Sequence, residues 1–382
     1  MHRREFLACA ATVPIAARAG LAAPVKGQAH ADVAELLRVN DLDRSIWQEE
    51  LDTFVPARLY DTHAHLTRLE FDLDPKRDQN PRLALSSSVF RGSGSLELLD
   101  AVNALLCPGR DVTHLLSPNP HPQCDFPGSN EFIAREALKK TGTAAQMVVH
   151  PRMTAREVDD AVRRHRFVGF KPYRWYSVTG DMDECRITDF MPEHQLEVAN
   201  RYGLIIRMHL SKKAAIADRE NLDDLERLTA KYARVRWLLA HCARSYSARP
   251  LERAASRLRS IPNLWYDTSS VCEIDAFDAL FSLVDRKRIC YGTDDFAVGV
   301  TRGKYVSYGS SWGEMNETNQ TLNKAHCDGR MTFVRYEMLR SMRRAARHTG
   351  LGRREIEDLF YDNGARLVEA ARGDLNRALG KA

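Results

Sequence analysis

Eight short apolar segments, each followed by a stretch with helical periodicity, constrain the fold of this 382-residue chain more than any other feature. The segments are rich in Val, Ile, Leu and aromatic residues, which favour β-strands. Strands that alternate with helices predict a parallel sheet with helices packed on its faces. Eight such units in a chain of this length predict an α/β fold of the (β/α)8 TIM-barrel type. The expected strands are residues 59–66, 112–117, 145–150, 167–173, 204–210, 236–242, 264–268 and 289–294.

Two long polar segments interrupt this rhythm, residues 67–110 after the first strand and residues 296–330 after the eighth. Loops of this length inside a compact domain usually carry function. In a barrel, both would follow the carboxyl ends of strands, where active sites lie. The sequence shows neither an internal repeat nor a second domain. We therefore expect one barrel over residues 57–375, preceded by a helical extension over residues 27–56.

Residues 1–26 have the layout of a targeting segment and not of part of the fold. Arg3 and Arg4 precede Phe6, and the Ala-rich, weakly apolar stretch that follows ends in small residues. Paired arginines in this position predict a twin-arginine signal peptide, and hence export to the periplasm. The seven cysteines beyond this segment are scattered and odd in number, so they do not predict a disulfide framework.

Composition excludes several classes of partner. The net charge of +5 is spread without a basic run or a basic and aromatic stripe, so nucleic acid is not expected. The chain has no stretch of about 18 apolar residues, so we expect no membrane span. A small molecule is the partner that this composition favours, and the chain is compatible with a homo-oligomer.

Histidines and one aspartate fall at the carboxyl ends of four of the expected strands. His63 and His65 are two residues apart at the end of the first strand, so their side chains share a face. His209, His241 and Asp294 close the fifth, sixth and eighth strands. The carboxyl ends of barrel strands meet at one rim, and imidazole and carboxylate groups are typical metal ligands. The set predicts a catalytic metal site, although each residue alone would fit an ordinary core or loop position.

These residues resemble the pattern of the amidohydrolase superfamily, within it the amidohydrolase-related branch that includes aminocarboxymuconate semialdehyde decarboxylase. The resemblance spans residues 56–372, and its ordered set of motifs is specific where each single motif is not. The motifs are Asp61-x-His63-x-His65, Gly169-Phe170-Lys171, His209, Ala240-His241, Gly292-Thr293-Asp294 and the closing segment Leu359–Leu367.

The resemblance implies a barrel of the metal-dependent hydrolase type that holds a divalent ion, usually zinc, through His63, His65, His209 and Asp294. His241 would lie close to the ion and polarise the substrate or move a proton. Asp294 would take a proton from bound water and pass it to the leaving group. Nitrogen and oxygen ligands with an open position suit catalytic Zn²⁺, which lowers the pKa of bound water to about 7.

Lys171 leaves the number of metal ions open. Some amidohydrolases carboxylate a lysine on the fourth strand and use it to bridge two ions. Lys171 fits that role, and it equally fits binding a substrate carboxylate or pairing with an internal acid. The branch that the sequence most resembles holds one ion. We therefore expect one ion, or two if Lys171 is carboxylated.

Cations and aromatic residues near the fourth and fifth strands indicate an anionic substrate. Lys171 and Tyr173 share a strand face, Arg174 follows them, and Arg207 lies inside the fifth strand. Together they predict that the site binds a carboxylate. The alternative is that the arginines pair with the acidic residues of the loop 181–184.

The expected activity is hydrolysis, in which metal-bound hydroxide attacks an ester, lactone or amide of a small carboxylate-bearing substrate. The same site would serve a metal-dependent decarboxylase, or a sugar isomerase of the uronate isomerase type. A further alternative, from a different class, is a barrel that has lost catalysis and only binds a ligand. The fold alone does not decide among these activities.

Overall fold

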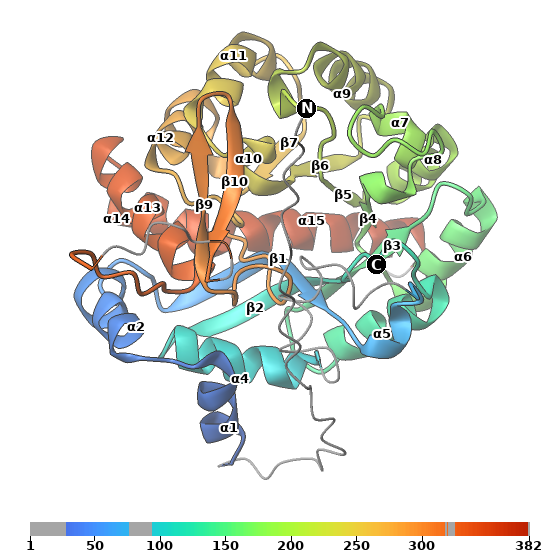
Figure 1. The fold of residues 1–382 in the computed structure, drawn as a ribbon. Coiled ribbons are helices and arrows are strands. Elements are labelled where there is room, and N and C mark those ends of the chain that lie inside the picture. Colours follow the sequence, from blue (N-terminus) through green and yellow to red (C-terminus); the bar gives the residue numbers. More distant parts are fainter. Residues whose placement is uncertain (1–27, 76–93, 318, 320–324, 381–382) are drawn as a thin grey trace, which may run out of the picture.

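Eight parallel strands form one sheet in the order β1 to β8, each hydrogen-bonded to the next along the chain, with helices around them (Figure 1). The predicted (β/α)8 TIM barrel is confirmed. The computed structural model describes residues 28–75, 94–317, 319 and 325–380, and the predicted signal peptide lies outside them. The strands are β1 (Arg58–Leu66), β2 (Asp111–Pro118), β3 (Ala144–Val149), β4 (Gly169–Pro172), β5 (Ile205–Met208), β6 (Arg236–Leu239), β7 (Leu264–Asp267) and β8 (Ile289–Cys290).

Backbone hydrogen bonds join the first strand to the segment that follows the last one. The Thr62 amide donates to the Tyr291 carbonyl oxygen (2.9 Å), and the Asp294 amide donates to the His63 carbonyl oxygen (2.7 Å). Closing the sheet in this way satisfies backbone groups that a sheet edge would leave unpaired. It also brings the end of the eighth repeat against the end of β1, although more than 200 residues separate them in sequence.

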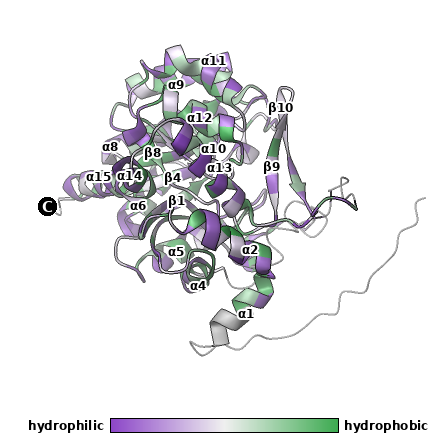
Figure 2. Ribbon diagram, turned by 90° about the vertical axis from the view of Figure 1, so that its left-hand side faces the viewer, coloured by the Kyte–Doolittle hydropathy of each residue, from purple (hydrophilic) through white to green (hydrophobic). Residues whose placement is uncertain are grey.

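Apolar side chains fill one end of the barrel, and α15 (Asn363–Ala378) covers that end. Figure 2 shows α15 on one side of the barrel and the β9–β10 hairpin on the opposite side. Burial of these apolar side chains stabilises the fold and fills the barrel interior at this end. The packed residues are Tyr60, Leu115, Ala144, Val168, Ile205, Leu238, Cys290, Ala365, Leu367, Val368 and Ala371.

Several helices of the repeats begin at a side-chain cap, among them the helix Ala155–His165 (α6). At the start of α6, the Glu157 amide donates to Thr154 Oγ1 (3.2 Å) and the Thr154 amide donates to the Glu157 carboxylate (2.7 Å). This reciprocal pair satisfies two backbone groups that a helix start leaves open. In the described part of the chain, no helix combines the length and the apolar character needed to cross a bilayer. The helices are α4 (Leu96–Leu106), α5 (Phe126–Ala137), α6 (Ala155–His165), α7 (Ile187–Phe190), α8 (Glu193–Tyr202), α9 (Arg219–Lys231), α10 (Ala240–Arg244), α11 (Ala248–Leu258), α12 (Ile274–Leu283), α13 (Val334–His348) and α14 (Arg353–Glu357).

Helices precede the barrel and a hairpin follows its last strand. The N-terminal helices are α1 (Gln28–Leu37), α2 (Asp41–Ser45) and a π-helical turn at Ile46–Leu51. Part of the segment 296–330, which the sequence predicts to be a loop, forms an antiparallel hairpin. Its strands are β9 (Gly303–Tyr308) and β10 (Ser311–Asn316). Figure 1 shows the hairpin standing in front of the barrel, at the end opposite α15.

Strands five, six and eight are shorter than predicted, so His209, His241 and Asp294 follow their strands instead of ending them. His241 and Asp294 have φ values of 58° and 63°. L-residues adopt this left-handed conformation at a cost, and it cannot continue a strand. The chain therefore turns sharply at both residues, at the rim of the barrel.

Candidate metal centre and active site

Three side chains meet at the carboxyl ends of β1 and β8. The distance between His63 Nε2 and His65 Nε2 is 3.1 Å. Asp294 Oδ1 lies 3.5 Å from the first of these atoms and 3.4 Å from the second. Ligand atoms that share one tetrahedral ion at about 2.1 Å lie about 3.4 Å apart. All three side chains are buried, and their spacing fits a single divalent cation.

Hydrogen bonds orient both imidazoles toward that cation position. His63 Nδ1 lies 2.9 Å from Asp267 Oδ2, and His65 Nδ1 lies 3.0 Å from the carbonyl oxygen of Pro118. These oxygens only accept, so each Nδ1 carries the hydrogen of its neutral ring. Both Nε2 atoms therefore turn a lone pair toward each other and toward the Asp294 carboxylate. Lone pairs that face one another at this distance repel. A cation bound between them would remove the repulsion, whereas no hydrogen lies between them to form a hydrogen bond.

The protonation states suit metal binding. Burial lowers the pKa of His63 well below its ordinary value and that of His65 to about 4. Burial alone would raise the pKa of Asp294, but the close His65 ring and the charge of Lys171 hold it at about 2. Asp294 Oδ2 also accepts a hydrogen bond from Ser270 Oγ (2.9 Å). Neutral imidazole and ionised carboxylate are the forms that bind metal ions.

Asp267, the last residue of β7, organises the neighbourhood of this cluster. Besides His63, its carboxylate accepts hydrogen bonds from the His241 amide (3.0 Å), the Ser269 amide (3.1 Å) and Ser269 Oγ (2.6 Å). A carboxylate behind a metal-binding histidine fixes its tautomer and raises its basicity. Gly292 lets β8 approach, because a Cβ atom there would lie 2.9 Å from the His63 Cβ. The candidate residues identified from the sequence do not include Asp267, although its place at the end of the seventh expected strand was a usable signal.

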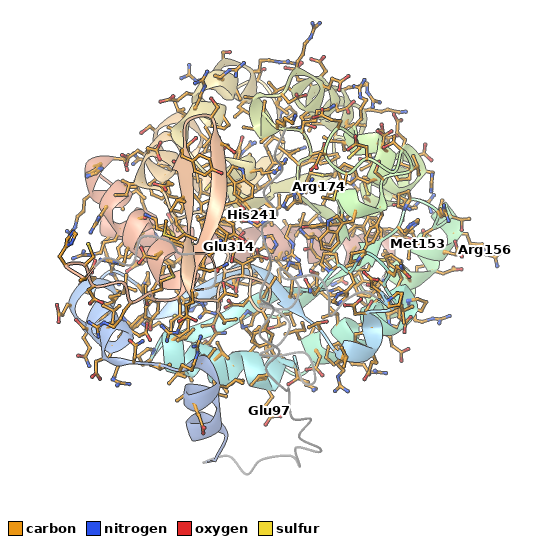
Figure 3. The ribbon with its side chains drawn as sticks, in the orientation of Figure 1. Glu97, Met153, Arg156, Arg174, His241 and Glu314 are labelled. Atoms are coloured by element: carbon orange, nitrogen blue, oxygen red, sulfur yellow. The ribbon has the colours of Figure 1, made fainter. Side chains whose placement is uncertain are left out.

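His241 sits on a left-handed turn that carries it to the barrel rim. Four consecutive residues from His241 to Arg244 have φ between 51° and 59°. His241 Nδ1 lies 3.1 Å from the Ser269 carbonyl oxygen, so its Nε2 is directed to the rest of the site. Its ring centroid is 5.1 Å from that of His63. Figure 3 looks into this end of the barrel and labels His241 near its centre.

His209, the fourth predicted ligand, lies beside the three-residue cluster and not within it. Its ring centroid is 5.1 Å from that of His241 and 5.2 Å from that of Tyr173. Burial lowers the pKa of His209 well below its ordinary value, so the ring is neutral and competent to bind a metal. The structure thus brings three of the four predicted ligands together and places the fourth in ring contact with His241.

Lys171 places a buried cation in the same region. Its side chain is 1% exposed, and it makes no hydrogen bond or ion pair with any residue that the structure describes. Its Nζ lies 5.3 Å from the centroid of the Tyr173 ring. Burial, together with the charge of Arg207, lowers the pKa of Lys171 to about 7. The carboxylates of Asp294 and Asp267 only partly offset this shift, and a buried lysine with a shifted pKa is typical of a functional site.

The two predicted substrate-binding arginines are held by other groups. Arg207 is fully buried inside the barrel and donates to the Thr62 carbonyl oxygen (3.0 Å) and to Ser117 Oγ. Arg174 donates to the Met182 carbonyl oxygen (3.0 Å) and pairs with Asp183, which is the alternative that the sequence left open. In this structure, Arg207 links β1 to β2 through its hydrogen bonds, and Arg174 holds the loop after β4 through its bonds to Met182 and Asp183.

Comparison with known proteins gives the family. The profile of the amidohydrolase family matches residues 60–369, which is most of the chain. The chain belongs to the amidohydrolase family. A search of curated protein sequences gave no match.

Solved structures of other proteins share the fold of this chain. The 4-oxalomesaconate hydratase of Rhodopseudomonas palustris shares 16% sequence identity, with a TM-score of 0.51, and the match covers 85% of this chain and 99% of that one. The 5-carboxyvanillate decarboxylase of Novosphingobium aromaticivorans, solved with manganese and 4-hydroxy-3-methoxy-5-nitrobenzoic acid, shares 13% identity with a TM-score of 0.51. That match covers 83% of this chain and 97% of the other. At these identities the likeness concerns the fold.

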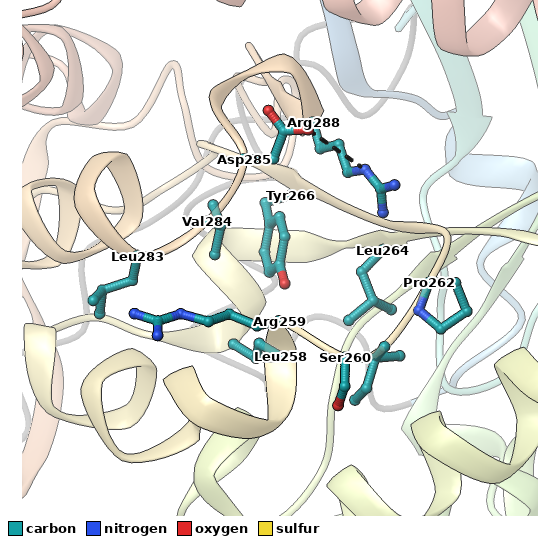
Figure 4. A pocket seen from close by; sticks show the side chains of 11 residues that line it. Leu258, Arg259, Ser260, Pro262, Leu264, Tyr266, Leu283, Val284, Asp285 and Arg288 are labelled. Carbon is teal, nitrogen blue, oxygen red and sulfur yellow. Dashed lines mark ion pairs between the residues drawn. The ribbon is translucent and has the colours of Figure 1, made fainter.

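A groove at the other end of the barrel is separate from the His63–His65–Asp294 cluster of this amidohydrolase. It has a volume of about 470 Å³ and lies at the amino ends of β7 and β8 (Figure 4). Its lining contains no histidine and none of the candidate site residues. It consists of Leu258, Arg259, Ser260, Ile261, Pro262, Leu264, Tyr266, Leu283, Val284, Asp285 and Arg288.

Proposed function

We propose that this amidohydrolase is a metal-dependent lyase that decarboxylates a small substrate bearing a carboxylate. The observation that carries the proposal is the buried, unpaired ammonium of Lys171 in the region of the His63–His65–Asp294 cluster. A buried cation without a partner is costly, and an anionic substrate would relieve that cost. The two similar structures named above are a hydratase and a decarboxylase, and both names favour lyase chemistry.

The roles of the residues follow from their positions. A divalent ion, when bound, acts as a Lewis acid toward a substrate oxygen. Lys171 would bind the substrate carboxylate, with the Tyr173 ring beside it. Decarboxylation breaks the bond between the substrate carbon and the carboxylate carbon, releases CO₂ and leaves the electron pair on the substrate. One proton must then reach that carbon: His241 would first take a proton from water at Nε2 and then deliver it to the carbon.

Hydrolysis of an ester, lactone or amide is the second candidate. The observation that favours it is the ionised, hydrogen-bonded carboxylate of Asp294. Its carboxylate has a pKa of about 2, and its Oδ2 is fixed by Ser270. A carboxylate held at the metal cluster in this way can take a proton from an attacking water molecule. Both candidates use the same metal ligands and differ in the bond that is broken.

Product analysis distinguishes the two candidates. The purified protein, loaded with zinc or manganese, would be tested for CO₂ release from 5-carboxyvanillate and from simple hydroxybenzoates, and for hydrolysis of 4-nitrophenyl acetate. Metal-dependent CO₂ release that falls in Lys171→Met and persists in Lys213→Met supports the proposal. Lys213 is the matched control because its side chain is exposed. Metal-dependent ester hydrolysis without CO₂ release would contradict the proposed decarboxylation and support the hydrolase activity.

Export stays a prediction from residues 1–26, and we propose that the folded enzyme reaches the periplasm by the twin-arginine route. Replacing Arg3 and Arg4 by lysine in the full chain tests it. The replacement should retain the protein in the cytoplasm, and unchanged periplasmic recovery would contradict the route.

A further inference from the structure

Aromatic rings connect the β9–β10 hairpin to His241. The Tyr246 ring stacks on the Trp312 ring of β10 with centroids 4.0 Å apart and an interplanar angle of 23°. The Tyr246 ring also lies near the His241 ring, with centroids 6.1 Å apart and an interplanar angle of 26°. Tyr305 of β9 contacts both aromatic rings, at 5.2 Å from Tyr246 and 5.6 Å from Trp312. The hairpin thus reaches His241 through a continuous stack.

The pairing of the two strands places these rings on one face of the hairpin. Tyr305 is paired with Glu314, and Ser307 is paired with Trp312. Side chains of directly paired residues, and of residues two apart on one strand, lie on the same face. This face is turned to the barrel, since Tyr305 and Trp312 both contact Tyr246.

The N-terminal extension fixes the base of the hairpin. Just before β9, Arg302 donates to both carboxylate oxygens of Asp43 in α2, at 3.2 and 2.6 Å, and both side chains are buried. Just after β10, Glu317 pairs with Arg38 at 2.6 Å. A two-stranded hairpin alone is only marginally stable in water. Bonds to the extension at both ends give the hairpin a fixed position over the site.

The turn that carries His241 needs support from outside. Non-glycine residues in the left-handed conformation cost free energy, and His241, Cys242, Ala243 and Arg244 all adopt it in succession. Such conformations persist only where the surroundings fix them. Hydrogen bonds to Asp267 and to Ser269 hold the inner side of His241. The Tyr246 ring is a further neighbour of the His241 ring.

We propose that Tyr246 and Trp312 are positioning residues, which hold the His241 ring in the orientation that aims its Nε2 at the reacting atoms. The proposal rests on the role of His241 in the proposed function. The hairpin and the N-terminal extension then belong to the catalytic apparatus, although neither contributes a metal ligand from the residues described. Without the stack, the turn at residues 241–244 relaxes and the imidazole samples other orientations.

Chemical footprinting of His241 tests this without turnover. Diethyl pyrocarbonate acylates unprotonated imidazole nitrogens, and the tryptic peptide 237–244 contains His241 as its only histidine. The rate of its modification would be measured by mass spectrometry on the full, metal-loaded protein. One stacked aromatic pair corresponds to a change of about two- to tenfold in an equilibrium. Trp312→Ala and Tyr246→Ala should therefore raise the rate for His241 about two- to tenfold.

Two further variants make the experiment decisive. Trp312→Phe keeps a stacking ring and should restore the wild-type rate, while Trp312→Leu keeps apolar bulk without stacking and should not. Tyr308→Ala is the matched control, because Tyr308 is 61% exposed and lies on the outer face of the same hairpin. The histidines of the peptide 59–68 should keep their rates, which shows that the change is local.

Two results would overturn the proposal. One is an unchanged His241 rate in Trp312→Ala and Tyr246→Ala. The other is an equal rise in Tyr308→Ala, which would mean that the hairpin loosens as a whole. If the protein proves to have no decarboxylase or hydrolase activity, the footprint still reports on the stack, so the two failures are distinguishable.

Discussion

Asp267→Asn is the substitution whose effect the structure specifies most closely. Asp267 Oδ1 accepts three hydrogen bonds, from the His241 amide and from the amide and hydroxyl of Ser269, whereas Oδ2 accepts one, from His63 Nδ1. In the variant, the amide oxygen takes the position with three donors. The amide NH₂ group then faces His63 Nδ1, so two donors meet.

His63 can relieve that contact only by moving its hydrogen from Nδ1 to Nε2. An Nε2 that carries hydrogen no longer offers a lone pair to a metal, so the cluster loses one of its three ligands. Loss of the partner behind a metal-binding histidine weakens metal affinity by about 10- to 100-fold, or about 1.4 to 2.7 kcal/mol. We expect at least this loss, since here the tautomer itself changes.

The assay is a competition titration of zinc against a chromogenic chelator, with the metal content checked by elemental analysis. Asp224→Asn is the matched control, because Asp224 is equally buried but pairs with Arg186 on the outer side of the fold. It should keep the wild-type affinity for zinc. Asp267→Asn with an unchanged affinity would refute the argument that His63 Nε2 is a ligand oriented by Asp267.

Three further predictions concern charge and stability. In the metal-free protein the pKa of Lys171 is about 7, below its ordinary value of 10.5, so between these values the unfolded chain binds more protons and stability rises with pH. Lys171→Met lacks this gain, so its free energy of unfolding should fall relative to that of the wild type between pH 7 and pH 10 in urea titrations. A difference that stays constant over this range would contradict the prediction. Lys171→Arg should keep one metal equivalent per chain by elemental analysis, whereas a fall from two equivalents to one or none would indicate a carboxylated lysine. Asp43→Ala leaves Arg302 buried without its partner and should cost about 3–5 kcal/mol of unfolding free energy, against less than about 0.5 kcal/mol for the exposed Asp41→Ala; similar losses in both would show that the buried pair is unimportant.

The sequence predicts the barrel well because its strands carry a strong apolar signal. All eight strands occur where they were expected, and the expected and observed strands differ mainly in where they begin and end. His63 and His65 meet as predicted, since two residues of one strand face the same way regardless of the rest of the fold. The contact of these two histidines with Asp294 depends on closure of the barrel, and the count of eight strands predicted that closure.

Other features depend on tertiary contacts that leave no local pattern. The left-handed turn at residues 241–244 contains no glycine, so nothing in its composition marks it. The strands of the hairpin β9–β10 mix apolar residues with polar residues and glycine, so they carry no continuous apolar signal. Arg207 reads as a substrate-binding cation in sequence, but its bonds to backbone and hydroxyl groups inside the barrel are visible only in three dimensions.

The central claim is that His63, His65 and Asp294 hold one divalent ion. Anomalous scattering from crystals of the protein grown with zinc or manganese tests it most directly. The account predicts one peak per chain, within about 2.3 Å of His63 Nε2, His65 Nε2 and Asp294 Oδ1. A peak on other residues, or crystals without any bound ion under these conditions, would contradict it.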